Sequence, residues 1–168
     1  MADAKAVYRA HPTREEIDDV LAQRLGSAVG TLNEDGTVHM AHVIFLYADG
    51  CLYLETSSTT RKARNAAARP TASMLVQGTA ATGRHLMVAA EGAARVLTGE
   101  DAVAINHRLR AKYLKPEALD AINRAWDRLD DVAIEITPTR WRSWTGGLLH
   151  EETQRELDMP YDDAWLAD

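Results

Sequence analysis

The hydrophobic residues near the N-terminus recur at the intervals of an amphipathic helix, at Ile17, Val20, Leu21 and Leu25. Thr13 and Glu16 have the spacing of a capping box, in which each side chain accepts a hydrogen bond from a backbone N–H of the first turn. The pattern therefore predicts a helix over residues 13–25, ended by Gly26.

After this helix, apolar and polar residues alternate as they do in strands. The alternation predicts strands over residues 28–32, 38–47 and 52–55, and Asp-Gly pairs at 35–36 and 49–50 supply the turns between them. Three consecutive antiparallel strands joined by such turns would form a meander.

The second half of the chain mixes strands and helices. Strand patterns cover residues 71–76, 86–97 and 131–136, and Glu91-Gly92 marks a bulge or bend in the long central one. Apolar rows at helical spacing predict two helices before the last strand, separated by Pro116. About six mostly antiparallel strands with helices inserted late predict an α+β fold, a small β-barrel with α additions.

One segment of this pattern carries candidate chemistry. Residues 56–60 are all Ser or Thr, and they stand between a strand and a short Ala-rich helix that Pro70 ends. That helix begins with Arg61 and Lys62 and also carries Arg64. Hydroxyls and free N–H groups at a helix start, backed by cations, suit a phosphate monoester. The alternative is a solvated basic helix between two strands. No Gly-rich cradle is present, so the segment is neither a nucleotide P-loop nor a Rossmann turn.

This segment resembles the FMN-binding split-barrel family of the pyridoxamine-phosphate oxidase type. In that family a strand ending in Thr or Ser leads into an "RKARNL…DPR" helix and then a "VSLLV" strand. The matching residues here are Thr56-Ser57, Arg61-Lys62-Ala63-Arg64-Asn65 and Arg69-Pro70-Thr71-Ala72-Ser73-Met74-Leu75-Val76. The similarity covers roughly residues 25–144. Two positions depart from the family pattern, because Arg69 stands in place of the usual Asp and Thr71 in place of Arg.

The resemblance implies a six-stranded, mostly antiparallel split barrel that forms a homodimer and binds FMN at the dimer interface. Residues 1–145 would form the flavin-binding domain, and residues 146–168 an acidic C-terminal tail. By the same resemblance, the cofactor phosphate would contact Ser57, Arg61 and Lys62. Thr56 would contact the ribityl chain or the edge of the ring.

The resemblance also places the isoalloxazine ring across the second strand, where the backbone of His42, Val43 and Ile44 would border it. Trp141 and Arg142 are further cofactor-binding candidates near the end of the last strand. Arg142 would face the flavin of the neighbouring subunit. The alternative for Trp141 is that it fills the end of the barrel.

The function implied is that of an FMN-dependent oxidoreductase, which transfers hydride to or from a small organic substrate. The alternatives are a deazaflavin-dependent reductase of the same fold and a non-catalytic flavin- or haem-binding protein. An acidic balance outside residues 61–69 favours FMN, whereas an Ala/Arg-rich, Lys-poor composition favours the deazaflavin. No catalytic residue is assigned. The C-terminal Arg-x-His of true pyridoxamine-phosphate oxidase is missing, which argues against that activity.

Composition limits the partners, the compartment and the metal sites that we expect for this protein. The chain has 168 residues and a formal net charge of -6, which argues against a nucleic-acid partner. The single cysteine, Cys51, excludes an internal disulfide framework and favours a reducing cytoplasm. No stretch approaches the length of a membrane span and no secretion signal is evident, so we expect a cytoplasmic protein without a membrane partner. His39 and His42 would leave opposite faces of a strand, and no metal-binding motif is present, so no metal site is expected.

Overall fold

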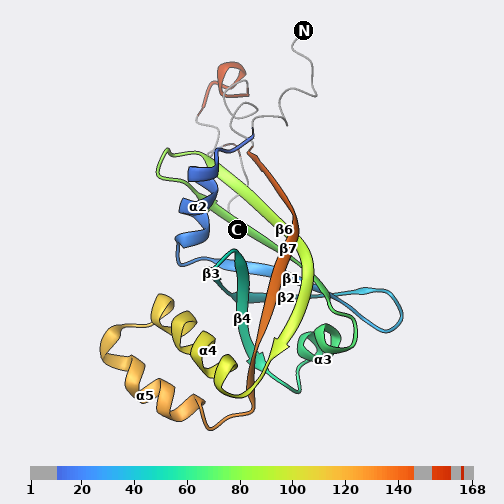
Figure 1. Ribbon diagram of the computed structural model, residues 1–168. Coiled ribbons are helices and arrows are strands. Elements are labelled where there is room, and N and C mark those ends of the chain that lie inside the picture. The colour runs from blue at the N-terminus through green and yellow to red at the C-terminus, as the bar shows by residue number, and fades with distance from the viewer. Residues whose placement is uncertain (1–10, 146–152, 160–163, 165–168) are drawn as a thin grey trace.

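The computed structural model describes residues 11–145, 153–159 and 164, and within them one seven-stranded antiparallel sheet is covered by helices (Figure 1). The strands are β1 (Gly26–Leu32), β2 (Val38–Ile44), β3 (Leu46–Ala48), β4 (Cys51–Ser57), β5 (Thr71–Thr79), β6 (His85–Leu97) and β7 (Asp131–Thr145). The main helices are α2 (Arg14–Ala22), α3 (Arg61–Ala68), α4 (Gly99–Tyr113) and α5 (Pro116–Trp126). The α+β class is confirmed, although the sheet has seven strands rather than six. Most of the predicted acidic tail, residues 146–168, lies outside the described residues.

The strand order is β2-β1-β5-β6-β7-β4-β3. Both antiparallel pairings of the predicted meander are present, because residues 38–44 pair with β1 and residues 46–48 pair with β4, but the middle strand is divided in two. β1 pairs with β2 at one end of the sheet, and β3 pairs with β4 at the other. The strand expected over residues 38–47 breaks at Phe45, whose side chain is fully buried. Val43 and Tyr47 also pack against the core, so the alternation of the sequence continues across the break. Periodicity alone therefore could not reveal that the chain changes its partner strand there.

The two ends of the sheet approach each other, because β2 also contacts β4. The sheet is thereby curled around one hydrophobic core (Figure 1). The strands contribute alternate residues to this core, most regularly in β5, where every second residue is buried. Large buried core side chains from the strands and the β2–β3 connection include Val29, Phe45, Leu54, Met74, Leu86 and Ile134.

The predicted bulge lies in β6, where the register with β7 shifts between Glu91 and Gly92. A Cβ atom on Gly92 would lie 2.0 Å from the backbone oxygen of Thr137, so only glycine permits this close approach of the two strands. The bulge lets the two longest strands of the sheet bend as it curls.

The predicted capping box at the start of α2 is confirmed. The Thr13 hydroxyl accepts a hydrogen bond from the Glu16 N–H, and the Glu16 carboxylate accepts one from the Thr13 N–H. The helix ends at Ala22, three residues earlier than expected, because Gln23 is extended. The Gln23 amide donates 2.9 Å to the backbone oxygen of Thr79 in β5, which holds the chain out of the helix.

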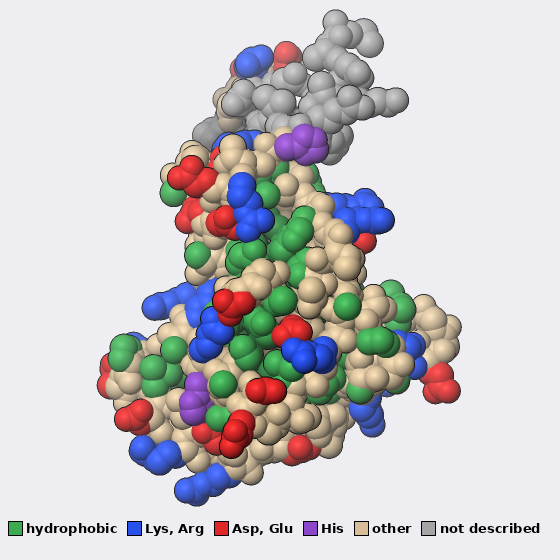
Figure 2. Space-filling model, in the orientation of Figure 1, with side chains coloured by type: hydrophobic (Ala, Val, Ile, Leu, Met, Phe, Trp, Pro, Cys, Tyr) green, Lys and Arg blue, Asp and Glu red, His purple; other side chains and the backbone are tan. Residues whose placement is uncertain are grey.

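The helices α4 and α5 form a pair on one side of the barrel. α4 packs against β3, β4 and β7, whereas α5 packs on α4. In Figure 2 charged side chains surround this pair, and hydrophobic side chains gather in the middle of the same face. None of the described helices combines the length and the apolar character needed to cross a bilayer.

A buried ionic cluster fixes α4 to the sheet. The Arg110 side chain on α4 is 2% exposed, and its guanidinium donates to both carboxylate oxygens of Glu55 in β4. It also donates to Asn123 at 3.2 Å and to Asp127 at 2.8 Å, and its Cζ lies 5.2 Å from the centre of the Trp126 ring. The burial of Arg110 is therefore compensated on every side by acceptors from β4, α5 and the end of α5.

We predict that Arg110→Met lowers the free energy of unfolding by about 3–5 kcal/mol, because Glu55 is left as a buried charge without its partner. Urea denaturation followed by circular dichroism measures the loss. In the double variant Arg110→Met/Glu55→Leu no buried charge remains unpaired, so most of the stability should return. A double variant as unstable as Arg110→Met would contradict this account.

A second carboxylate ties α2 to the turn between β5 and β6. The buried Glu16 side chain accepts hydrogen bonds from the Thr82 hydroxyl and the Arg84 guanidinium, both at 2.8 Å, in addition to the Thr13 N–H. The Thr13 N–H, the Thr82 hydroxyl and the Arg84 cation lower the pKa of Glu16 below the ordinary value of a glutamate.

This shift predicts a contribution to acid stability. Because the pKa of Glu16 is lower in the folded protein, its contribution is present above about pH 4.5 and is lost as the pH falls through the folded value. Glu16→Gln should therefore flatten the dependence of the free energy of unfolding on pH between roughly pH 5 and pH 3. Urea titrations across that pH range measure the free energy of unfolding. If this energy depended on pH in the same way in the variant and the wild type, Glu16 would not be the group responsible.

Candidate functional site

The hydroxyl-rich segment forms the junction at which β4 passes into α3. β4 ends at Ser57, the last residue that pairs with β7. Thr60 is the N-cap of α3, and its hydroxyl accepts a hydrogen bond from the Ala63 N–H at 3.4 Å. The buried Thr56 hydroxyl lies 3.0 Å from that of Thr60. The local sequence thus builds a capped helix start directly behind a strand end, as expected.

The other hydroxyls of this junction differ in how far they are available to bind a ligand. The hydroxyls of Ser57 and Thr59 lie 3.0 Å from each other. Ser58 is fully engaged, because its hydroxyl donates to the Asp130 carboxylate and its N–H donates 3.0 Å to the Asp130 backbone oxygen. Ser57 is therefore the better placed of the two serines to bind an anion.

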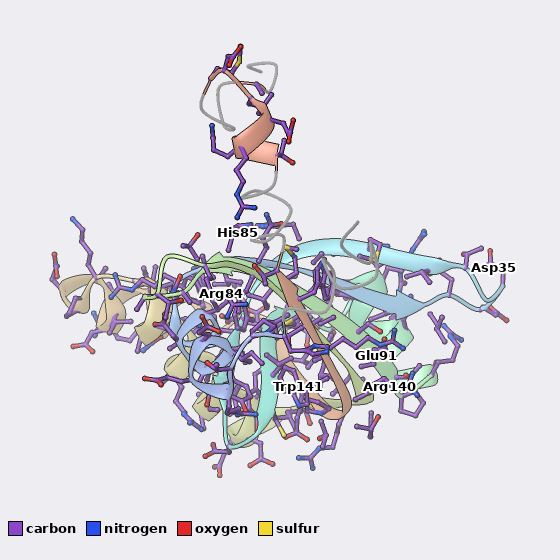
Figure 3. All side chains as sticks on the ribbon, turned by 90° about the horizontal axis from the view of Figure 1, so that it is seen from above. Asp35, Arg84, His85, Glu91, Arg140 and Trp141 are labelled. Atoms are coloured by element: carbon purple, nitrogen blue, oxygen red, sulfur yellow. The ribbon has the colours of Figure 1, made fainter. Side chains whose placement is uncertain are left out.

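The two cations at the start of α3 have different surroundings. Lys62 is half-buried, and burial lowers its pKa. Arg61 is exposed and lines a shallow depression together with Glu34 and Asp35 of the β1–β2 turn. Figure 3 shows Asp35 at the far tip of that hairpin. Among the described residues, neither Arg61 nor Lys62 lies within ion-pair distance of a carboxylate. Lys62 thus remains the cation of this junction whose charge no nearby acid compensates.

The helix α3 is fixed to the β1–β2 hairpin by two of its polar residues. The buried Asn65 donates to the Thr31 hydroxyl at 3.2 Å and to the Asn33 side chain at 3.0 Å. Arg69 donates 2.7 Å to the backbone oxygen of Leu32 and 3.0 Å to the Asn65 side chain. Arg69, which departs from the family pattern, therefore serves to anchor the helix, a role that the sequence alone did not indicate.

The three candidates on β2 divide between the two faces of the sheet. Val43 points inward and packs against the core, whereas His42 and Ile44 are exposed. The His42 ring lies over Gly26, since a Cβ atom there would be 2.2 Å from Nε2. α3 packs against both β1 and β2, so the helix start and this strand belong to the same region of the molecule.

The outward side of β2, β1 and β5 is unusually apolar, and we call it the outer sheet face. Its exposed apolar side chains are Val38 (57% exposed), Met40 (58%), Ile44 (42%) and Leu75 (37%). A cavity of about 360 Å³ opens beside them, and its lining includes Gly30, Met40, Ser73, Leu75, Glu91 and Trp144. None of the residues predicted above from the sequence was expected to form such a surface. The signal was available, because a strand with His42 pointing outward also exposes Val38 and Met40.

Trp141 and Arg142 also lie on opposite faces of their strand. Trp141 packs against the core and makes an edge-to-face contact with Tyr47, with ring centres 5.8 Å apart. Arg142 points outward and, with Arg140, flanks Glu91 at N–O distances of 3.8 and 3.6 Å. Figure 3 shows Glu91 and Arg140 side by side. The position of Trp141 agrees with the alternative in which it fills the barrel.

The predicted residues are therefore only partly brought together. Thr56, Ser57, Arg61 and Lys62 gather at the junction of β4 and α3. His42 and Arg142 share the outer sheet face, because both lie on one row of paired residues that runs through Ala28, Leu75 and Ala89. Four strand spacings separate them, about 19 Å along the sheet. Within one chain they cannot both border the same ring.

Across the part of the chain that is described, no group of three or more His, Cys, Asp or Glu side chains is placed to hold a metal ion.

Comparisons with known proteins identify relatives of this arrangement. The family model of pyridoxamine 5'-phosphate oxidase matches residues 13–145. No curated protein matches the chain. Among solved structures, a conserved hypothetical protein from Mycobacterium tuberculosis is 22% identical over 84% of this chain and 91% of its own, with a TM-score of 0.69.

Two further solved structures differ in what their names describe. An F420 reductase is 23% identical over 78% of this chain and 98% of its own, with a TM-score of 0.55. A haem storage protein from Vibrio cholerae is 14% identical over 78% of this chain and 94% of its own, with a TM-score of 0.61. At such identities the likeness concerns the fold alone. With the family match, it confirms the split-barrel class.

Proposed function

The chain belongs to the pyridoxamine 5'-phosphate oxidase family, and on that premise we propose that it is an FMN-dependent oxidoreductase. It would transfer hydride to or from a small organic substrate. The observation that carries the proposal is the junction of β4 and α3, where Lys62 is half-buried without a carboxylate partner among the described residues, beside Arg61 and the Ser57 hydroxyl. Even partial burial of a cation without a counter-ion costs free energy, and a bound phosphate would reduce that cost.

The residues at this junction would hold the phosphate end of FMN. Lys62 and Arg61 would supply charge, Ser57 a hydroxyl donor, and the first turn of α3 its N–H groups. Thr56, whose hydroxyl is buried next to Thr60, would border the ribityl chain or the ring edge. The flavin supplies the electron-transfer chemistry when bound, while the protein positions it and excludes water.

The ring would lie along β2, beside the backbone of His42, Val43 and Ile44. The outward side chains of this strand belong to the outer sheet face, and the mostly apolar cavity of about 360 Å³ opens further along the strand, at Val38 and Met40. An apolar wall with a few polar groups suits a planar ring. No side chain is assigned as an acid or base, because hydride transfer to or from a flavin requires none from the protein.

We also propose a homodimer, on the basis of the same surface. Four large apolar side chains of the outer sheet face are more than a third exposed, an arrangement that is typical of a protein interface. A second copy seated there would cover them. It would also bring its own Arg142 toward the ring bound by the first copy, which one chain alone cannot do, and Trp141 would support that strand from the core side.

A deazaflavin-dependent reductase is the second candidate, favoured by the likeness to an F420 reductase. A haem-binding protein is the third, favoured by the likeness to a haem storage protein. The absorption spectrum of the freshly purified protein separates the three. Flavin bands support the proposal, deazaflavin bands support the second candidate, and a Soret band with no flavin binding would overturn both.

We predict that Arg61→Ala/Lys62→Ala weakens FMN binding at least tenfold, because two charge-assisted contacts of about 1.5–3 kcal/mol each are lost. Titration of FMN into the apoprotein, followed by flavin absorbance and fluorescence, measures the affinity. The matched control is Lys115→Ala/Arg124→Ala, which removes one exposed Lys and one exposed Arg from α5 and its N-cap. Equal affinities of the two double variants would place the phosphate elsewhere.

We predict that Met40→Glu dissociates the dimer, because it introduces a charge into the centre of an apolar interface. Sedimentation equilibrium should show an increase of at least about tenfold in the dimer dissociation constant. Leu129→Glu is the matched control, since Leu129 is 59% exposed but lies outside the outer sheet face. A wild-type protein that is monomeric at micromolar concentration would refute the dimer.

A further inference from the structure

The backbone of Phe45 has unusual hydrogen-bond partners. Phe45 lies between β2 and β3, so its N–H and carbonyl groups belong to neither strand ladder. Its N–H donates 3.3 Å to the Tyr113 hydroxyl, which also lies 2.9 Å from the Phe45 carbonyl oxygen. Buried backbone groups must find partners, and here a side chain at the end of α4 supplies them.

The same hydroxyl reaches the neighbouring strand. The Tyr113 hydroxyl lies 2.8 Å from the backbone oxygen of Leu25, the residue directly before β1. Gly26 and Ile44 form the outermost pair of the β1–β2 ladder at this end. Leu25 and Phe45 are the residues just beyond that pair, so one hydroxyl closes the ladder where its own hydrogen bonds stop.

Lys112 reinforces this contact from the adjacent position. Its ammonium donates 3.3 Å to the Phe45 carbonyl oxygen and 3.0 Å to the Leu21 carbonyl oxygen in the last turn of α2. It also lies 4.2 Å from the centre of the Phe45 ring. The carbonyl of Phe45 is therefore held by two side chains at once, and α2 is joined to the same point. We call the side chains of Lys112 and Tyr113 the clasp.

The turn of α4 that precedes the clasp is held in place by contacts of its own. One turn earlier on α4, Leu109 is fully buried and Arg110 is bound to Glu55 of β4. The position of the last turn of α4 is thus set by contacts with the far end of the sheet. The clasp in turn holds the end of β2 in a fixed place relative to α4.

We propose that Lys112 and Tyr113 are positioning residues of the cofactor site, which hold the end of β2 at the place where its backbone borders the flavin ring. This inference rests on the proposed function, because it gives the clasp a role only if a ring lies along β2. Ile44 is adjacent to Phe45, and the His42 ring lies over Gly26, whose neighbour Leu25 is also held. Loss of the clasp would free both sides of the ladder that carries these candidates.

The test compares Tyr113→Phe, Lys112→Met and Ile105→Val with the wild type. Tyr113→Phe removes only the hydroxyl, and Lys112→Met keeps most of the aliphatic stem while removing the donors. Ile105→Val is the matched control, because Ile105 lies on α4 and packs against a cluster of buried residues to which Phe45 does not belong. Burial lowers the pKa of Lys112 to about 8, so the work is done near neutral pH, where the ammonium is charged. The temperature is kept well below the melting point of every variant.

The readouts are the dissociation constants for FMN and for the deazaflavin coenzyme, the visible circular dichroism of the bound ring, and amide hydrogen exchange at Phe45. We expect both clasp variants to weaken binding about fivefold or more and to alter the dichroism of the ring. Exchange at Phe45 should accelerate in Tyr113→Phe, and Ile105→Val should change neither affinity nor dichroism.

Two results would overturn the inference in distinguishable ways. If exchange at Phe45 accelerates while affinity and dichroism match the wild type, the clasp serves stability alone, and the proposed function stands. If all four proteins, the wild type included, bind neither FMN nor the deazaflavin, the proposed function fails and the positioning role fails with it.

Discussion

The connection between β2 and β3 is a single residue, and this constraint determines the shape of the molecule. The two strands occupy opposite ends of the sheet, six strand spacings apart. In a flat sheet that separation would be about 29 Å, whereas the two steps from Ile44 through Phe45 to Leu46 span at most about 7 Å. The sheet must therefore curl until its ends meet. The contact between β2 and β4 and the register shift at Glu91 and Gly92 are consequences of that requirement.

Curling has different effects on the two sides of the sheet. The inner side encloses the hydrophobic core, in which Phe45 itself is fully buried. The outer side over β1, β2 and β5 keeps exposed apolar residues, among them Met40 and Leu75. The helix pair α4–α5 is fixed to the other end of the sheet through Arg110 and Glu55. One part of the sheet is thus covered by this helix pair, whereas the outer sheet face keeps its apolar side chains exposed.

Much of this fold could be predicted from periodicity and turn residues. The capping box of α2, the bulge in β6 and the strand–helix–strand order around α3 all depend on local sequence, and all were confirmed. The partner of each strand was not predictable in the same way. The alternation of apolar and polar residues indicates which side chains face the core. It continues unchanged through Phe45, where the chain stops pairing with β1 and begins to pair with β4.

The candidate site was predictable to a similar degree. The hydroxyls and cations of the β4–α3 junction are consecutive in sequence, so they could be identified together. The anchoring role of Arg69 depends on the Leu32 carbonyl and on Asn65, and the clasp joins Tyr113 to Leu25 and Phe45. Both depend on tertiary contacts between residues far apart in the chain, which no local pattern records. Adjacent residues of a strand point to opposite faces, so the sequence already predicted that Trp141 and Arg142 lie on different sides of the sheet. Which of the two faces the core could be decided only from the structure.

The electrostatics of the junction bear on which cofactor it would accept. Lys62 stands without a carboxylate partner among the described residues, whereas its neighbours in the chain have acids beside them. Asp35 and Glu34 share a depression with Arg61, and the Asp130 carboxylate accepts the Ser58 hydroxyl. At physiological salt the Debye length is about 8 Å, so a ligand anion that came closer than this to an acid would be repelled. A compact phosphate monoester could use Lys62, Arg61 and Ser57 while avoiding these acids. A long anionic tail would have to pass one acidic group or the other, and would be repelled there. On this contrast we base the proposal of FMN rather than a deazaflavin coenzyme.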